Sequence, residues 1–336
     1  MIKSFAKLLV LFALALTASA ASEENVTREI NSAPGEKLVV DVDFGSVNVT
    51  AGGEDKVVLE AHRKIDFGDE AKEKEYLANV PITLTKEGNV VTVRSRGTKP
   101  NEWNVGCRQT DAKYGVRIPK KFEMALRTDG GAISVSDITG NLNAHTSGGS
   151  MAFARLEGTL EGETSGGFIE TKDCRGLIDI ETSGGHIKVR QGKGSLNAHT
   201  SGGHIEVRDF SGDTEVRTSG GDLDLEKISG KLVGKTSGGS IRAAIPVVAD
   251  VKLETSAGNI DLSVPASAAF AIEANTSVGE VVTRLPIQTS DVHQEYPREH
   301  LHGTLNGGGK SVLLGTSAGN ITIKPIAEEV ANLQTR

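Results

Sequence analysis

Hydrophobic and polar residues alternate along most of the chain, and glycine interrupts the alternation at regular intervals. Between residues 182 and 199, Ile187 and Val189 alternate with charged residues, a glycine turn follows, and Leu196 and Ala198 alternate with polar residues. Alternation with a period of two predicts β-strands with one buried face. We therefore expect this segment to form two short strands and two turns, without helix.

The same segment recurs along the chain with a fixed period of 18 residues. A fixed period held over many copies is the signature of a solenoid, in which each repeat is one coil. The tetrapeptide Thr-Ser-Gly-Gly begins at Thr146, Thr164, Thr182, Thr200, Thr218 and Thr236, and variants of it begin at Thr128, Thr255, Thr276 and Thr316. The variant at Thr316 closes the series after a longer gap.

Equivalent positions of successive repeats carry similar residues, which predicts parallel coils stacked in register about 4.8 Å apart. Three columns are mostly apolar and are expected to face inward, at the fifth, tenth and fourteenth residue after each threonine. The threonines continue the inward alternation, so we expect a buried ladder of hydroxyl groups. An outward threonine array of the ice-binding kind would break that alternation.

Glycine fills the twelfth column completely, from Gly140 to Gly230. Such a column indicates backbone with positive φ, which glycine adopts without steric cost. The turn glycines Gly184 and Gly185 are candidates for the same conformation.

The rest of the chain is β-rich but less regular. Strands are expected within residues 37–50, 57–61, 90–94 and 116–119, a short helix from Asp69 to Leu77, and a loop over residues 287–304. Solenoids need atypical ends that cover the exposed core and edge. We expect an all-β fold, a parallel β-solenoid (β-helix or β-roll) with 18-residue coils of two short strands, capped by irregular β-rich N- and C-terminal flanks. The expected divisions are a signal peptide (1–20), a flexible N-terminus (21–35), an N-terminal flank (36–126), regular repeats (127–280), a C-terminal cap (281–326) and a tail (327–336).

The first twenty residues have the pattern of a secretory signal peptide. Lys3 and Lys7 precede an apolar run of about nine residues, and Ala18, Ser19 and Ala20 supply small residues for cleavage between Ala20 and Ala21. The run is shorter than the ~18–20 residues of a membrane-spanning helix. The residue directly after the cleavage site is alanine and not cysteine, and no later segment is apolar enough to span a membrane. We expect an exported mature chain, periplasmic or extracellular.

Composition excludes several classes of protein. The chain has 336 residues, 37 basic and 44 acidic, and a formal net charge of −7. This acidic balance argues against a nucleic-acid partner, which normally requires a basic surface. Two cysteines cannot form a disulfide scaffold for a chain of this length, and the 40 glycines do not follow a collagen period.

The motifs resemble those of a bacterial family of exported β-strand-repeat proteins of unknown function, known as putative adhesins. The resemblance rests on Gly115-Val-Arg-Ile-Pro-Lys-Lys121, on the Thr-Ser-Gly-Gly coils, on Gly303-Thr-Leu-Asn-Gly-Gly-Gly309 and on Thr316-Ser-Ala-Gly-Asn-Ile-Thr-Ile323. It covers roughly residues 36–325 and implies a parallel β-solenoid. It brings no catalytic residues, and a fold does not by itself fix a function.

One outward column places His186, His204 and Asp222 in three successive coils. Side chains stacked in this way could chelate a metal such as zinc, but a column of solvated polar residues is the favoured interpretation. We therefore expect no metal and no cofactor.

A neighbouring outward column contains Lys172, Arg190 and Arg208, with Lys188 beside them, as a weak candidate surface patch for an anionic glycan or phosphate. Glu170 and Glu206 interleave with these residues, which favours a ladder of paired charges.

The Gly-Gly turns and the two cysteines each allow a further interpretation, as calcium sites and as a disulfide bridge. Calcium-binding β-rolls need Gly-Gly-x-Gly-x-Asp every nine residues, whereas here an apolar residue stands two positions after Gly-Gly and the period is 18. Cys174 lies in an inward column and favours a buried thiol, although an oxidising compartment would permit a bridge to Cys107.

No catalytic constellation stands out. The favoured function is an exported non-catalytic β-solenoid protein, adhesin-like, that binds or supports a cell-envelope component, a polysaccharide or another protein. The alternatives are a β-helix polysaccharide lyase or hydrolase and an accessory protein of envelope stress or signalling. Outward aromatic residues are scarce, essentially Phe168 in the coils, which weakens sugar stacking.

Overall fold

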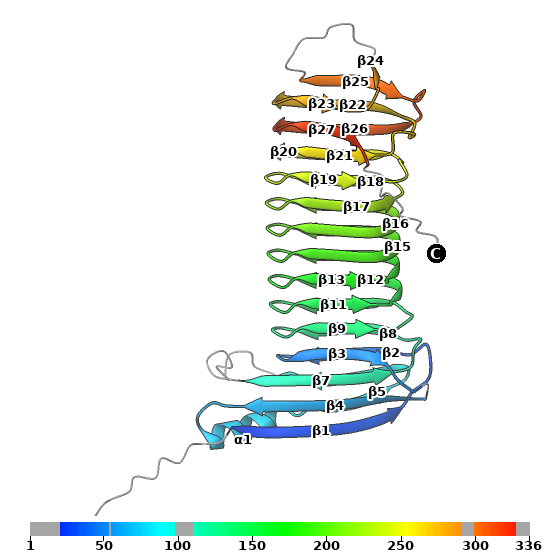
Figure 1. Cartoon of the computed structure of the whole chain (residues 1–336). Helices are drawn as coiled ribbons and strands as arrows, with labels where there is room; N and C mark the ends of the chain where they lie inside the picture. The colour runs from blue at the N-terminus through cyan, green and yellow to red at the C-terminus, as the bar shows by residue number, and fades with distance from the viewer. Residues whose placement is uncertain (1–20, 54, 98–109, 290–298, 327–336) are drawn as a thin grey trace, which may run out of the picture.

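The structure is a computed structural model and describes residues 21–53, 55–97, 110–289 and 299–326. Nearly all of these residues belong to one long stack of β-coils (Figure 1). The expected all-β parallel solenoid is confirmed: within the described residues 27 strands form one continuous sheet, and one helix lies at the N-terminal end. The signal-peptide segment (1–20), Cys107 and the tail (327–336) lie outside the described residues.

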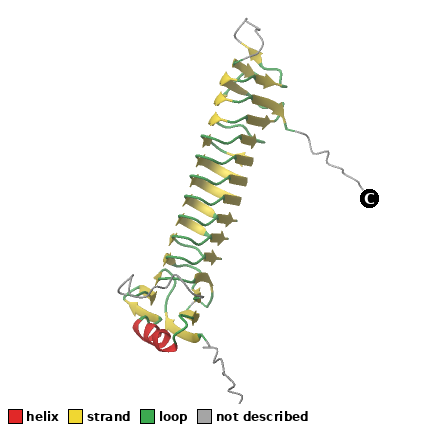
Figure 2. Cartoon of the chain, turned by 90° about the vertical axis from the view of Figure 1, so that its left-hand side faces the viewer, coloured by secondary structure: helices red, strands yellow, loops and turns green. Residues whose placement is uncertain are grey.

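Each regular coil contributes one strand to each of two layers, which face each other across the core (Figure 2). Layer A contains the strands that follow the Thr-Ser-Gly-Gly turns, and layer B contains the strands that lead into those turns. Layer A consists of β9 (Ile133–Ser136), β11 (Met151–Ala154), β13 (Ile169–Lys172), β17 (Leu223–Ser229), β19 (Ile241–Ala244) and β21 (Ile260–Val264). Layer B consists of β8 (Glu123–Thr128), β10 (Leu142–Thr146), β12 (Glu157–Thr164), β14 (Arg175–Thr182), β18 (Leu232–Thr236) and β20 (Val251–Ala257). Two longer strands, β15 (Ile187–Thr200) and β16 (Ile205–Thr218), run through both layers.

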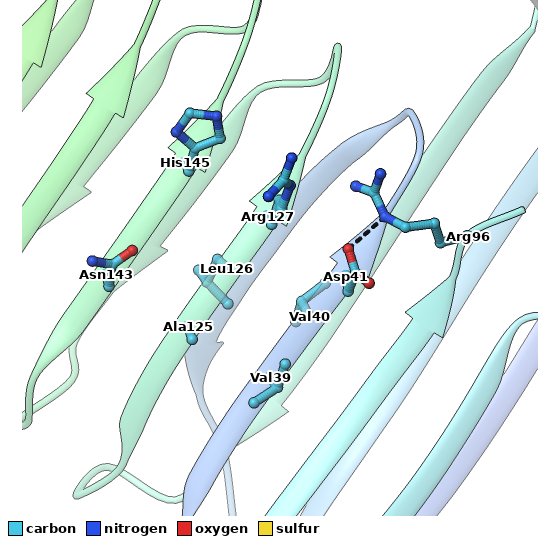
Figure 3. A pocket seen from close by; sticks show the side chains of 9 residues that line it. All are labelled: Val39, Val40, Asp41, Arg96, Ala125, Leu126, Arg127, Asn143 and His145. Carbon is cyan, nitrogen blue, oxygen red and sulfur yellow. Dashed lines mark hydrogen bonds and ion pairs between the residues drawn. The ribbon is translucent and has the colours of Figure 1, made fainter. Parts of the chain in front are cut away.

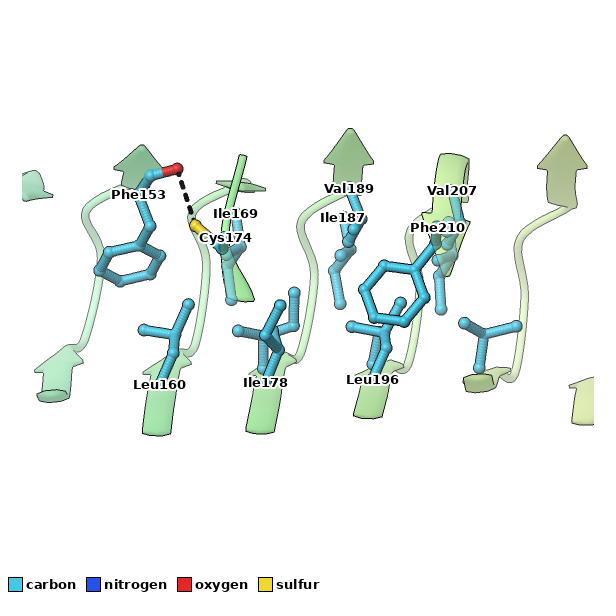
Figure 4. Packing of buried hydrophobic residues seen from close by; sticks show 14 of the residues in the cluster. Phe153, Leu160, Ile169, Cys174, Ile178, Ile187, Val189, Leu196, Val207 and Phe210 are labelled. Atoms are coloured by element: carbon cyan, nitrogen blue, oxygen red, sulfur yellow. Dashed lines mark hydrogen bonds between the residues drawn. The ribbon is translucent and has the colours of Figure 1, made fainter. Parts of the chain in front are cut away.

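The register between coils is the 18-residue register that the sequence predicts. Ile169 pairs with Ile187 in layer A, and Ile178 pairs with Leu196 in layer B, both in parallel strands. Side chains of the two layers meet in a continuous apolar core (Figure 4). The tenth column also lies inside, and the ring of Phe210 occupies the space that a side chain at Gly192 would need. Apolar residues at equivalent positions of successive coils thus stack on one another to form the core.

The threonine column is a buried hydroxyl ladder, as expected. Thr182 is completely buried, and its Oγ1 donates to the carbonyl of Gly167 in the preceding coil at 2.8 Å. The same oxygen accepts the backbone N–H of Gly185 at 3.2 Å. Equivalent bonds recur along the stack. Each threonine hydroxyl therefore forms hydrogen bonds with two backbone groups of the glycine turns, a carbonyl and an N–H, that would otherwise be buried without a partner.

The two kinds of glycine column have different physical causes. Gly176, Gly194 and the rest of the twelfth column have positive φ, as expected. Gly184 and Gly185 do not, so positive φ at these turn glycines was a wrong expectation. Gly185 is required for another reason: a Cβ there would lie 1.9 Å from the carbonyl oxygen of Gly167.

The corner between layers A and B contains a feature that the sequence does not signal. Six non-glycine residues there have positive φ, between 53° and 67°. This left-handed conformation costs an L-residue roughly 1–2 kcal/mol. Some corner side chains pair between coils, as Arg155 does with Asp137. The six residues are Asp137, Arg155, Asp173, Gln191, Asp209 and Lys227.

The N-terminal end is closed by antiparallel strands and a helix. Its elements are β1 (Ser22–Asn31), β2 (Lys37–Val42), β3 (Ser46–Ala51), β4 (Lys56–Ile65), α1 (Glu70–Asn79), β5 (Thr83–Glu87), β6 (Val90–Ser95) and β7 (Asp111–Ile118). The outermost strand, β1, pairs antiparallel with β4, which pairs antiparallel with β7. The expected helix is present, with Asp69 as its N-cap rather than its first residue.

The C-terminal elements are β22 (Phe270–Val278), β23 (Val281–Thr283), β24 (Gln288–Thr289), β25 (His300–Leu305), β26 (Lys310–Ala318) and β27 (Ile321–Pro325). β25 pairs antiparallel with β22. The loop that we expected over residues 287–304 is therefore wrong at residues 288–289 and 300–304, which form strands, and residues 290–298 lie outside the described residues.

The coils at both ends do not stack in chain order. The coil β2–β3 lies between β6–β7 and β8–β9, and the coil β26–β27 lies between β20–β21 and β22–β23 (Figure 1). The coil of Thr316 therefore closes the series in sequence but not in space. The first and last coils of the chain are each covered by a coil from further inside the sequence.

Candidate ligand-binding face

The predicted column of His186, His204 and Asp222 is a hydrogen-bonded ladder along the turns. Nδ1 of His186 accepts the backbone N–H of His204 at 2.9 Å, and Nδ1 of His204 accepts that of Asp222 at 2.8 Å. The two imidazole rings are stacked with their centroids 5.1 Å apart. Asp222 in turn accepts the backbone N–H of Ser240 at 2.8 Å.

This geometry uses the atoms that a metal would need. An imidazole whose Nδ1 accepts an N–H carries its own proton on Nε2 when it is neutral, so neither nitrogen offers a free lone pair. No group of three or more potential metal ligands occurs among the described residues. The ladder continues through Ser240, Asn259 and Asn320 to the backbone of Glu280, which identifies its role as pairing backbone N–H groups.

Three of the four neighbouring basic residues pair with a carboxylate, and Lys172 forms no ion pair among the described residues. Lys188 pairs with Glu206 at 2.9 Å, and Arg190 lies 3.9 Å from Glu170. Arg208 pairs with Glu206 at 2.9 Å and lies 3.4 Å from Glu226. The outward face of layer A therefore carries a ladder of paired charges, in which no basic stripe is left open at these positions.

A different surface, the outward face of layer B, contains a hollow of about 560 Å³ (Figure 3). Residues of β2, β8 and β10 form most of it together with Arg96, which follows β6, because these three strands stack although β2 is far from the others in sequence. Its lining combines small apolar side chains with hydrogen-bonding and charged groups. The lining residues are Val39, Val40, Asp41, Arg96, Ala125, Leu126, Arg127, Asn143 and His145.

Arg96 anchors one wall of this hollow. Its guanidinium binds Asp41 at 2.6 Å and both carboxylate oxygens of Asp129 at 2.9 and 3.1 Å. These bonds hold the pKa of Asp129 below its usual range, whereas burial raises the pKa of nearby Asp43. These bonds hold the Arg96 side chain in place. The second arginine of the hollow, Arg127, is paired less tightly, because its guanidinium lies 3.7 Å from Asp129.

A second hollow of about 190 Å³ adjoins the first and shares Asn143 and His145 with it. It lies over β10, β12 and β14 and is lined by acidic side chains. The carboxylates on this part of the face are Glu161, Glu163, Asp179 and Glu181. We call the two adjoining hollows together the layer B face.

The four carboxylates of the second hollow have asparagine and histidine neighbours. Asn143 donates to Glu161 at 2.7 Å, Asn197 donates to Asp179 at 2.9 Å, and Nδ1 of His145 lies 3.4 Å from Glu163. No ion pair among the described residues joins any of the four to a lysine or arginine. Some other outward carboxylates of the coils do have such pairs, among them Asp137, Glu206 and Glu226.

The layer B face offers hydrogen-bond donors, acceptors and uncompensated negative charge over a span of five strands. Within one coil, outward positions such as Glu161 and Glu163 are separated by one inward residue and lie on the same face. Such an array suits non-covalent contact with an extended partner.

The sequence contains a signal for this face: the outward column before each threonine includes His145, Glu163, Glu181 and His199, and the expected interpretation of this column is a ladder of paired charges. The motif Leu-Asn-Ala-His occurs at residues 142–145 and again at 196–199, on either side of the two acidic strands. The alternation identifies its Asn and His as outward, so the acidic band could have been recognised. The hollow could not, because Asp41, Arg96 and Arg127 come from segments whose neighbourhood depends on the displaced coil β2–β3.

Cys174 is a free, buried thiol in the described structure. Its Sγ lies 3.6 Å from the carbonyl oxygen of Phe153, and burial raises the pKa of the thiol.

The residue that stands two positions after Gly-Gly in each turn, such as Ile187, is buried and cannot ligate calcium. Among the described residues, no helix combines the length and apolar character needed to cross a membrane.

Comparison with known proteins gives a family match. A family model described as Toastrack DUF4097 matches residues 35–324. No curated protein matches the chain. Similar solved structures include a putative adhesin from Parabacteroides distasonis ATCC 8503 (11% identity, 90% of this chain, 97% of that chain, TM-score 0.39) and a putative adhesin from Parabacteroides merdae ATCC 43184 (11%, 92%, 98%, 0.33). Another is a putative lipid binding protein from Parabacteroides distasonis ATCC 8503 (11%, 92%, 98%, 0.34). Likenesses at these identities and TM-scores carry no argument about a ligand of this chain.

Proposed function

Because the chain belongs to the Toastrack DUF4097 family, we propose that it is an exported, non-catalytic binding module, adhesin-like, that contacts a component of the cell envelope through its layer B face. The observation that supports this proposal most directly is the pair of adjoining hollows on that face. The first hollow falls within the range of about 300–1,000 Å³ that is usual for ligand sites.

The charge of the two outward faces supports layer B rather than layer A as the contact surface. The basic residues Lys188, Arg190 and Arg208 of the layer A face are already paired within the chain, whereas Asp224 on the same face forms no ion pair among the described residues. The four carboxylates of the acidic band form no ion pair with lysine or arginine, and His145 beside Glu163 is their only ion-pair partner among the described residues, so a partner with positive charge gains electrostatic energy there.

The test is capture of an envelope component with matched charge variants. Purified protein without residues 1–20 is immobilised and exposed to envelope extracts at low and physiological salt. We expect specific enrichment of one component, lost in Glu163→Lys and kept in Asp224→Lys, which makes the same charge change on the layer A face. Equal loss in both variants, equal retention in both, or no enrichment with the unchanged protein would overturn the proposal.

The polysaccharide lyase or hydrolase alternative is tested with the same protein. The acidic pair Glu163 and Glu181 on adjacent strands is where such an activity would be sought. Incubation with a panel of acidic polysaccharides should yield no unsaturated ends and no reducing sugar. Product that depends on Glu163 or Glu181 would make the protein an enzyme. An accessory role in envelope stress would instead appear as a captured signalling protein.

A further inference from the structure

The N-terminal cap contains a buried carboxylate that the layer B face does not use. Glu73 lies in the first turn of α1 and is completely buried. Its Oε2 accepts the backbone N–H of Ser22 at 3.1 Å and the hydroxyl of Ser22 at 2.8 Å, and its Oε1 accepts the backbone N–H of Phe67 at 2.9 Å. The carboxylate therefore fixes the first residue of β1 against the helix.

This carboxylate is ionised but lacks a cationic partner in the described structure. Burial alone would raise the pKa of Glu73, but the hydrogen bonds from Ser22 and Phe67 outweigh it and hold that pKa below its usual range. No lysine, arginine or histidine of the described residues forms an ion pair with Glu73. The other buried charge of the cap, Arg63, does have a partner, since it binds Glu24 at 2.6 Å. A buried charge without an opposite charge is costly.

The position of the predicted cleavage site supplies the missing cation. Cleavage between Ala20 and Ala21 turns the backbone nitrogen of Ala21 into an α-ammonium group. One residue spans at most about 3.6 Å, and Ser22 N lies 3.1 Å from Glu73 Oε2. The new ammonium therefore lies within about 7 Å of the carboxylate, in a partly buried setting.

We propose that Glu73 is a binding site for the α-ammonium group that proteolytic removal of residues 1–20 creates at Ala21. The inference rests on the exported nature of the protein, and it adds a structural consequence of processing. The reaction that supplies the ligand is hydrolysis of the Ala20–Ala21 peptide bond, in which water provides the hydroxyl group of the new carboxylate and the proton of the new amine. In the uncleaved chain the same nitrogen is a neutral amide, and β1 closes the cap without the ion pair.

The site is tested with two forms of the chain that differ only at the N-terminus. One begins at Ala21 with a free amine, and the other retains residues 17–20 ahead of Ala21. We expect amide hydrogen exchange in β1 to be about fivefold slower with the free amine, the size that a partly screened ion pair supports. In the free-amine form, the α-amine should titrate above its ordinary value of about 7.7–8.0, followed by NMR with labelled Ala21.

Two variants separate this ion pair from simple packing. Glu73→Gln keeps one acceptor oxygen, which serves Ser22 or Phe67 but not both, and removes the charge; both forms carry this change equally, so the difference between them should vanish. Ser22→Ala removes only the hydroxyl bond, so the difference should persist. Equal exchange in the two unchanged forms, an ordinary amine titration, or a difference that survives Glu73→Gln would overturn the proposal.

The experiment also distinguishes failure of the site from failure of the export premise. The intact mass of protein recovered outside the cytoplasm shows whether the chain begins at Ala21. A different N-terminus would remove the physiological source of the ammonium and overturn the role in processing. Exchange and titration of the prepared forms report on Glu73 independently of that mass.

Discussion

At the scale of single residues, the turns depend on close approach between coils rather than on unusual backbone angles. A Cβ at Gly185 would lie 1.9 Å from the carbonyl oxygen of Gly167, whereas a Cβ at Gly184 meets nothing closer than 3.8 Å. The two neighbours in one motif therefore have different requirements. The sequence shows that both are glycine, but only the structure separates them.

Substitution by alanine should therefore lower the stability of the fold at Gly185 and leave it nearly unchanged at Gly184. Gly185→Ala forces backbone of two coils apart, a change of the overpacking kind that costs roughly 1–3 kcal/mol or more. Gly184→Ala should be near neutral, because its methyl group has room. Thermal unfolding followed by circular dichroism measures both, and a loss of stability in Gly184→Ala as large as that in Gly185→Ala would contradict the turn geometry.

The hydroxyl ladder leads to a second residue-scale prediction. Thr182→Val preserves shape but leaves the carbonyl of Gly167 and the N–H of Gly185 without their partner. A buried polar group left unpaired costs roughly 1–3 kcal/mol. Thr182→Ser keeps the hydroxyl and loses only a methyl group. Denaturant unfolding should show Val as the more damaging change, and the reverse order would mean that the methyl group matters more than the hydroxyl.

At the scale of the element, coils are similar but not interchangeable. The ring of Phe210 lies over Gly192 of the preceding coil, so close that a Cβ at Gly192 would be 2.6 Å from it. The tenth column thus alternates in size between these two coils. Neighbouring coils are fitted to one another beyond their shared period.

Two deletions of one full period test this fit. Removing residues 182–199 deletes Gly192 and places Phe210 against the buried side chain of Cys174. Removing residues 164–181 keeps Phe210 over Gly192. Both products should be soluble and β-rich, but the first should melt at a lower temperature. Equal melting temperatures would show that the match between Phe210 and Gly192 carries no stability.

The repeat period predicts which residues of neighbouring coils stack, but it does not predict the backbone conformation at the corners. The spacing of Thr182 and Thr200 fixes which residues stack, because the register of parallel coils equals the repeat length. The left-handed corner at Arg155 and Gln191 could not be predicted, because neither residue type favours that conformation and only the stack enforces it. The layer B hollow escaped prediction for a related reason, since Arg96 reaches Asp41 and Asp129 only through the displaced coil β2–β3.

At the scale of the whole molecule, both ends are interlocked. Leu313 of β26 pairs with Lys252 of β20 on one side and with Glu273 of β22 on the other. Each Thr-Ser-x-Gly turn carries the same local signature, so sequence alone cannot rank the spatial order of the three coils. The interlock ties the last coil between two coils that precede it in the chain.

Engineered disulfides test the spatial order of these three coils directly. Lys252→Cys with Leu313→Cys should form a bridge, because the two residues are register partners on adjacent strands. Lys252→Cys with Glu273→Cys should not, because their strands are two spacings apart, beyond the Cα separation of about 7 Å that a disulfide tolerates. Peptide mapping under oxidising conditions distinguishes the pairs, and a bridge in the second pair alone would establish chain-order stacking.

The central claim is that the chain is a stack of 18-residue coils in which each coil contacts mainly its neighbours. The most direct measurement compares cooperative melting of two deletions that begin at the same residue. Removing residues 164–181 takes out one period and joins Glu163 to Thr182, so every inward column restacks. Removing residues 164–172 takes out half a period, sets one layer against the other, and reverses the alternation because nine is odd. The first variant should stay soluble, β-rich and cooperative, and the second should aggregate or melt broadly; similar behaviour of the two, or milder damage from the shorter deletion, would contradict the coil assignment.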